Sequence, residues 1–259
     1  MYHPPRLRTR LTTIQRLCGS PNLPPKKAIR GRRCCSAICI AWAAVCPRDA
    51  EQAAGWYRKA AVQGNAAGQY HLGVMFTAGR GVTRDYGEAR RWHLKAAAQG
   101  CAASEFEIGL MYWTGFGAEI DKAVGLQRFR KAADRGNADA QFYLGHAYEY
   151  GQGVEKDDAE AVRWYRKAAL QGNVAGQNAL GLMYDVGKGI GKDRAEAERW
   201  YRKAASQGYP PAEFNVGVLL SGSGVKYDVA ASLRWSRRAA SHGSTDAQVK
   251  LGWLYMEGQ

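Results

Sequence analysis

Cysteine is nearly absent from residues 47–259 of this chain, where Cys101 is the only example. A disulfide framework needs cysteine pairs, so none can hold this part together. The other five cysteines lie at positions 18, 34, 35, 39 and 46. The last four could supply zinc ligands by type, but their spacing is not a familiar zinc pattern, and their apolar setting favours ordinary hydrophobic packing. We therefore expect no metal and no cofactor.

Acidic residues are absent from the first 48 positions, which contain ten Lys or Arg. Subtracting these from the chain's 37 leaves 27 basic and 23 acidic residues in 49–259, a net charge of +4 there against +14 for the whole chain. The basicity thus belongs to an N-terminal arm, and the rest has an ordinary solvated surface that disfavours nucleic-acid binding. Binding of nucleic acid or another anionic surface through the arm remains an alternative, and it should vanish when residues 1–46 are removed and weaken with salt.

Long hydrophobic runs are also missing. The longest, residues 34–46, has 13 residues, whereas a bilayer span needs about 20, so we predict no transmembrane helix. The run could be a signal-peptide core with a cleavage site at 41–43, which would export the protein to the periplasm. It could instead be a capping helix of a cytoplasmic protein. Residues 1–33 are basic and contain proline, and we expect a disordered arm.

Glycine, in contrast, is frequent and regularly placed. An Ala-Ala-x-x-Gly motif or a close variant puts glycine at 64, 100, 136, 172, 208 and 243, with spacings of 36, 36, 36, 36 and 35. A second glycine, after Leu, Ile or Val, falls at 73, 109, 145, 181, 217 and 252 with the same spacings. Two series of glycines share one period and the same one-residue shortening at the last step, which indicates an internal repeat.

Each period predicts two helices. Residues 161–169 place Ala, Trp, Tyr, Ala and Ala on one helical stripe, and residues 197–205 repeat it one period later. The other helix carries Leu144, Gly145 and Tyr148. A large aromatic residue on one helix facing glycine on the other would allow close approach.

Polar residues mark the helix ends. Aspartates at 49, 85, 121, 157, 193 and 228 start the Trp-bearing helices, and four of them have Glu or Gln three residues later, which predicts capping boxes. The glycines at 64, 100, 136, 172 and 208 fit the left-handed position after a helix. The pairs 79/81, 115/117, 151/153, 187/189 and 222/224 predict tight turns between helices.

The segments 140–145, 151–154 and 164–169 resemble the Sel1-like repeat family, relatives of the tetratricopeptide repeat, almost residue for residue. The resemblance covers about residues 49–259. It implies an all-α, right-handed superhelical solenoid of two-helix repeats. We place five full units near 66–99, 102–135, 138–171, 174–207 and 210–242, with half-units at either end of an array spanning 47–259. Because the last residues stop where a turn should continue, we expect either that the chain is truncated or that a partner covers this end.

No catalytic constellation stands out, and we predict that the protein is not an enzyme. Ser223-Gly224-Val225-Lys226 matches the S-x-x-K motif of penicillin-recognising enzymes, and some cysteine-rich Sel1-repeat proteins have been labelled β-lactamases. A β-lactamase-like hydrolase is therefore an alternative. The motif, however, falls on the Gly-x-Gly turn that every unit shares, with no S-D-N or K-T-G after it.

The resemblance implies a scaffold or adaptor that binds other proteins, whose identity the sequence does not give; it gives no oligomeric state either. In related repeats the first helices line the concave side, and there the stripe opposite Leu-Gly-Tyr is least constrained by packing. One column of it reads His71, Glu107, Tyr143, Ala179, Asn215 and Lys250. We predict a partner-binding surface that includes His71, Glu107, Tyr143, His146, Tyr150 and Asn215, with Tyr143 and Tyr150 as aromatic anchors. The alternative is that these tyrosines pack on the neighbouring repeat.

Overall fold

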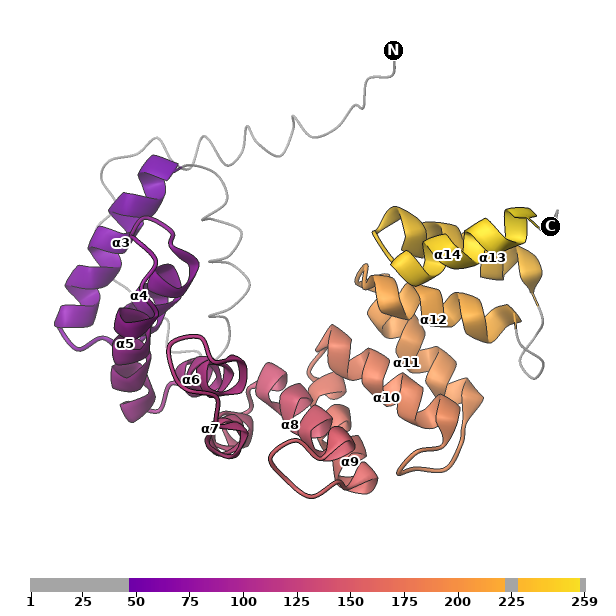
Figure 1. Cartoon of the computed structure of the whole chain (residues 1–259), viewed down its shortest axis with the longest axis horizontal. Coiled ribbons are helices and arrows are strands. Elements are labelled where there is room, and N and C mark those ends of the chain that lie inside the picture. The colour runs from indigo at the N-terminus through magenta and orange to yellow at the C-terminus, as the bar shows by residue number, and fades with distance from the viewer. Residues whose placement is uncertain (1–46, 222–227, 257–259) are drawn as a thin grey trace, which may run out of the picture. The chain divides into compact units, whose positions relative to one another are not determined.

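The computed structural model describes residues 47–221 and 228–256, with side chains from Ala50 onward. These residues belong to one compact unit that spans 45–259, and they form helices joined by turns, with no strand among them (Figure 1). The helices are α3 (Pro47–Val62), α4 (Ala66–Ala78), α5 (Tyr86–Ala98), α6 (Ala102–Thr114), α7 (Lys122–Asp134), α8 (Ala138–Tyr150), α9 (Asp158–Leu170), α10 (Val174–Val186), α11 (Arg194–Ser206), α12 (Pro210–Ser221), α13 (Val229–Ser241) and α14 (Thr245–Met256).

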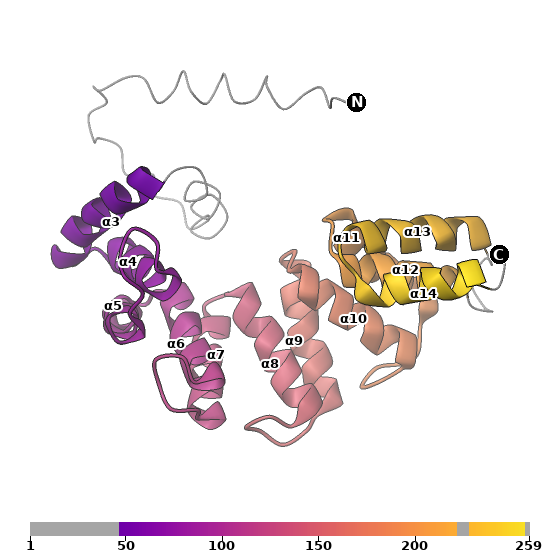
Figure 2. The ribbon, with the colours of Figure 1, turned by 45° about the horizontal axis from the view of Figure 1, so that its top comes forward.

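The even-numbered helices from α4 to α12 are the first helices of five units, and each packs on the second helix that follows it (Figures 1 and 2). The two helices pack closely at the glycine that follows Leu, Ile or Val in the first helix. A Cβ atom at Gly145 would lie 2.5 Å from Tyr165 Cδ1, and one at Gly181 would lie 2.7 Å from the same atom of Tyr201. Glycine is therefore required here because the tyrosine ring occupies the space of a side chain.

The aspartate column caps the second helices, as predicted. Asp85, Asp121, Asp157, Asp193 and Asp228 each accept a hydrogen bond from a backbone N–H of the first turn. In a full capping box the side chain three residues later would also accept from the backbone N–H of the aspartate, but the first helix binds that N–H at Asp85, Asp157 and Asp193. The backbone N–H of Asp157 instead donates to Tyr148 O in the first helix, and Glu160 pairs with Arg163 at 3.2 Å. Because the first helix already satisfies that N–H, the glutamate is free to bind an arginine.

The glycines that follow the second helices and those in the turns between helices also adopt the predicted conformation. Gly64, Gly100, Gly136, Gly172 and Gly208 have φ between 77° and 87°, and the described turn pairs from 79/81 to 187/189 all have positive φ. This left-handed region disfavours residues with a Cβ atom, which explains why glycine recurs at these positions.

Glutamine side chains connect successive units. Gln141 donates to Ala133 O of the preceding second helix at 3.2 Å and accepts from Gln171 of its own unit at 2.7 Å. Gln69–Gln99 and Gln177–Gln207 repeat the second contact. In the unit of α6 and α7, Glu105 takes the place of the first glutamine and Arg135 takes the place of the second. Their side chains form an ion pair, with Arg135 Nη1 3.6 Å from Glu105 Oε1. A buried polar group is thus matched by a complementary one in each case.

The column of Tyr165 and Tyr201 holds His93 in the unit of α4 and α5. His93 is fully buried. Its ring lies where a side chain at Gly73 would be, with Nε2 2.7 Å from the Cβ position. Burial lowers the pKa of His93 to about 4, so it packs as a neutral ring.

The fold is therefore an all-α repeat array, as predicted. Our predictions for the arm 1–33, for the apolar segment 34–46 and for the end of the chain at 257–259 lie outside the described residues, as does the side chain of Asp49. None of the helices in the part that the structure describes is both long and apolar enough to cross a membrane.

Candidate functional site

Each first helix has two different faces. One face turns to the second helix and buries the same kind of residue in every full unit: Leu72, Ile108, Leu144, Leu180 and Val216 have no exposed surface. The opposite face carries residues that are half-buried or exposed and differ between units. We call this face the first-helix stripe. It consists of His71, Val74, Glu107, Leu110, Tyr143, His146, Tyr150, Ala179, Leu182, Val186, Asn215, Val218, Lys250 and Trp253.

Aromatic residues concentrate on the stripe at α8. Tyr143 is half-buried, and its ring centroid lies 5.1 Å from that of Phe129 in the preceding unit. Tyr150 is 56% exposed and lies 4.6 Å from His146, centroid to centroid. Tyr143 therefore takes part in packing between repeats, whereas Tyr150 is an exposed residue with Lys188 Nζ 5.6 Å from its ring centroid.

His146 lies between these tyrosines on the stripe. Its Nδ1 atom is buried and has no hydrogen-bond partner among the described residues, and burial lowers the pKa of the imidazole. A buried polar atom without a hydrogen-bond partner costs stability, so Nδ1 of His146 does not help to hold α8 in the array.

Two carboxyl groups adjoin the aromatic residues. Burial and the charge of Asp139 raise the pKa of Glu107 to about 7, and burial also raises the pKa of Asp139, although Asn173 Nδ2 donates to it at 2.7 Å. Within the described residues, no Lys or Arg forms an ion pair with either group. The scaffold thus provides no cation that would stabilise the Glu107 carboxylate on the stripe, and burial favours its protonated form.

The other predicted residues lie on separate helices. His71 of α4 stacks on Tyr57 with ring centroids 4.9 Å apart, and Asn215 Nδ2 of α12 donates to Asn178 Oδ1 at 2.9 Å. The structure therefore brings Tyr143, His146 and Tyr150 together on one helix, with Glu107 on the neighbouring one, and leaves His71 and Asn215 at other points of the stripe.

Trp253 was missed as a site residue, and Lys250 was recognised only as a member of the column. Both lie on α14 and line a cavity at the end of the stripe. The column signal could have found Lys250, because it is the only lysine or arginine at that position. The residues that complete the cavity come from two helices that begin 35 positions apart, and they have no sequence signature.

No group of three or more His, Cys, Asp or Glu in the part of the chain that the structure describes could hold a metal ion. The Ser223–Lys226 motif lies outside the described residues.

Comparison with known proteins agrees with the repeat architecture. The model of the Sel1 repeat matches residues 44–65, 66–101, 102–137, 138–173, 174–209, 210–244 and 245–259. No curated protein matches the chain.

Several solved structures are similar. A protective antigen of uropathogenic Escherichia coli with an SLR fold is 36% identical, with a TM-score of 0.70 over 81% of this chain and 45% of that one; this chain therefore spans less than half of that protein. A Sel1 repeat protein from Oxalobacter formigenes is 35% identical, with a TM-score of 0.71 over 75% and 80%. One from Klebsiella pneumoniae, at 22% identity and a TM-score of 0.53 over 78% and 99%, shares the fold. Proteins with Sel1 repeats are generally non-enzymatic interaction scaffolds, and this chain belongs to the Sel1 repeat family.

Proposed function

We propose that this protein is a scaffold that binds a partner protein or peptide along the first-helix stripe. The observation that carries the proposal is the contrast between the faces of the first helices. The face toward the second helix keeps Leu, Ile or Val followed by Gly in every full unit, whereas the stripe changes its residues from one unit to the next. Packing explains the constant face, and variation on the other face suits recognition of a partner.

The residues of the stripe also have suitable chemistry. Tyr150 offers a large, exposed ring with a hydroxyl group. Beyond it, Leu182, Val186 and Val218 are 41%, 62% and 43% exposed. An aromatic anchor followed by apolar residues matches the surfaces that hold amphipathic helices or extended peptides.

The test uses the full chain as bait in a lysate of the source organism, with two matched variants. Tyr150→Ala removes the exposed anchor. Leu170→Ala removes a side chain that is 70% exposed on the second helix α9, away from the stripe. Circular dichroism and thermal unfolding establish that both variants keep the fold, and bound proteins are identified by mass spectrometry.

We expect a partner that is captured by the wild type and by Leu170→Ala but lost with Tyr150→Ala. The same partners on all three baits would contradict the proposal, and so would a folded wild-type bait that retains nothing beyond what the Tyr150→Ala bait retains. Tyr143 is unsuited to this test because its ring packs on Phe129 of the preceding unit.

A further inference from the structure

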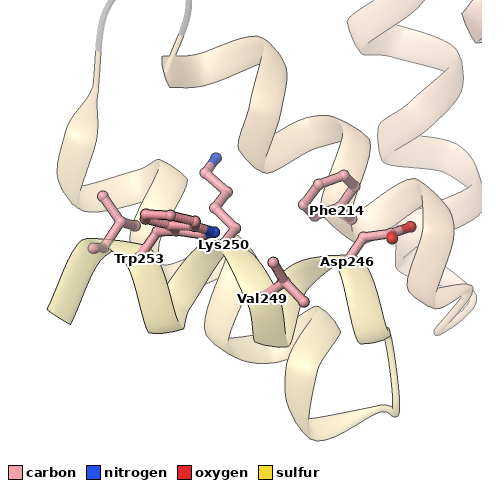
Figure 3. Close-up of a pocket in the computed structure, with 6 residues that line it drawn as sticks. Phe214, Asp246, Val249, Lys250 and Trp253 are labelled. Atoms are coloured by element: carbon pink, nitrogen blue, oxygen red, sulfur yellow. The ribbon is translucent and has the colours of Figure 1, made fainter. Parts of the chain in front are cut away.

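The stripe ends in a cavity between α12 and α14 (Figure 3). It is a shallow depression that is open to solvent, with a volume of about 560 Å³, so a ligand would lie on its surface and keep one side exposed. The lining residues are Phe214, Asp246, Val249, Lys250, Trp253 and Leu254. Four of these six are apolar, so the cavity combines apolar walls with one basic and one acidic group.

Lys250 has no negatively charged partner among the residues that the structure describes. Its Nζ atom lies 3.4 Å from each of three neutral oxygens, Gly217 O, Ser221 Oγ and Ser232 Oγ. Burial lowers the pKa of this amine. The ammonium group is thus held in place by weak neutral contacts, and an anion would stabilise its charge.

The apolar walls adjoin this ammonium group. Nζ lies 5.9 Å from the ring centroid of Phe214, and Trp253 is 60% exposed on the same face of α14. Asp246 is the acidic residue of the described lining, and Figure 3 shows its carboxylate and the Lys250 amine pointing in different directions. An anion that reaches Lys250 can therefore avoid the Asp246 carboxylate while the rest of the ligand contacts the rings.

We infer that this cavity binds the carboxyl terminus of a partner protein whose last residue is large and apolar. In such a residue the carboxylate and the side chain leave the same carbon atom. One residue can therefore place an anion on Lys250 and apolar surface against Phe214 and Trp253. An internal glutamate or aspartate would bring the charge without the adjoining apolar group. The inference rests on the proposed function, since it names the chemistry that one end of the stripe recognises.

The experiment compares two probes that differ only in charge. N-acetyl-leucyl-leucine carries a free carboxylate, and its C-terminal amide does not. Each is titrated at millimolar concentrations into the ¹⁵N-labelled full chain, and the backbone amide shifts of α12 and α14 give the affinity. Lys250→Met keeps the length of the side chain and removes the charge, and thermal unfolding shows whether that variant remains folded.

We expect the acid to bind about tenfold more tightly than the amide, the ratio expected when one charge-assisted hydrogen bond is lost. Lys250→Met should remove this preference while leaving the amide's affinity unchanged. Asp246→Asn should strengthen binding of the acid, because it removes the carboxylate from the lining. Equal binding of the two probes, shifts confined to other helices, or a preference that survives Lys250→Met would each overturn the inference.

A lipid-like anion and a failure of the proposed function each give a distinct result. Binding of decanoate with no binding of either dipeptide would assign the cavity to a lipid-like anion and reject a protein carboxyl terminus. If the probes show no preference but Tyr150→Ala still loses the captured partner, the inference fails and the proposed function stands. If the acid is preferred over the amide but Tyr150→Ala and the wild type retain the same partners, the proposed role of Tyr150 as an anchor is wrong.

Discussion

Helix α8 illustrates how differently the two faces of a first helix are determined. On one face Leu144 is fully buried and Gly145 lies beneath the Tyr165 ring, with no room for a methyl group. On the other, Tyr150 is 56% exposed and Nδ1 of His146 lacks a hydrogen-bond partner within the described part of the chain. The first face is fixed by what it must contact, so it repeats with the period of the fold. The second is not fixed in this way, and the proposed function rests on this contrast.

The largest effect should come from the packed face. Tyr165→Ala removes a ring that is 1% exposed and whose hydroxyl donates to Glu149 at 2.7 Å. We expect a loss of roughly 3–5 kcal/mol in the free energy of unfolding, because a cavity forms beside Gly145 and Glu149 loses one of its two donors. Urea denaturation measures the loss, and Tyr165→Phe, which retains the ring, should account for a minor part of it. A loss below about 1 kcal/mol for Tyr165→Ala would mean that this face does not determine the fold.

On the stripe we expect a smaller change in the free energy of unfolding, and a gain in stability rather than a loss. Burial and the charge of Asp139 raise the pKa of Glu107 to about 7. A carboxyl group with a raised pKa is favoured in its protonated form by folding, so stability is lost as the pH rises from about 4.5 to about 7. Glu107→Gln should therefore unfold less readily than the wild type at pH 8, by on the order of 1–3 kcal/mol, and about equally at pH 4.

Denaturation curves at the two pH values test this prediction. Glu119→Gln, at an exposed position in the turn after α6, is the matched control and should change stability by less than about 0.5 kcal/mol. A Glu107→Gln protein less stable than the wild type at pH 8 would show that the scaffold uses this carboxylate, and the contrast between the two faces would weaken.

The smallest effect on stability concerns the helix ends. The Asp157 carboxylate accepts from the backbone N–H of Glu160 at 2.9 Å. Asp157→Ala should cost about 1 kcal/mol, and Asp157→Asn, which keeps the acceptor oxygen, much less. Thermal unfolding of the two variants distinguishes a cap from a charge effect: equal losses would mean that the hydrogen bond is not what stabilises this end of α9.

The sequence predicts these structural features unequally well. The cap at Asp157 and the left-handed glycine at 172 depend on a few neighbouring residues, so their columns could be interpreted directly. The contact of Gln141 with Gln171 joins residues 30 positions apart, and its chemistry changes in the unit where Glu105 meets Arg135. The repeat period alone does not identify such a pair, because it does not show which columns lie in contact in the folded chain.

The candidate site was less predictable than the fold for the same reason. The column of first-helix residues from His71 to Lys250 identified Tyr143, but the contact of Tyr143 with Phe129 depends on how two units approach each other. It also included Lys250, whose significance depends on its neighbours Phe214 and Trp253 in the folded chain. His93 could be placed in the column of Tyr165, yet its complete burial follows from the aromatic position it occupies rather than from its own polarity.

The most direct test of the central claim measures the binding and the stability of the same variants. For a captured partner, the dissociation constant is determined for the wild type, Tyr150→Ala and Leu182→Ser on the stripe, and Leu170→Ala away from it, together with each free energy of unfolding. We predict binding at least about tenfold weaker for the two stripe variants, with unfolding changed by less than about 1 kcal/mol, and wild-type binding for Leu170→Ala. Wild-type affinity in both stripe variants would contradict the account, as would a loss of binding that merely follows a loss of stability.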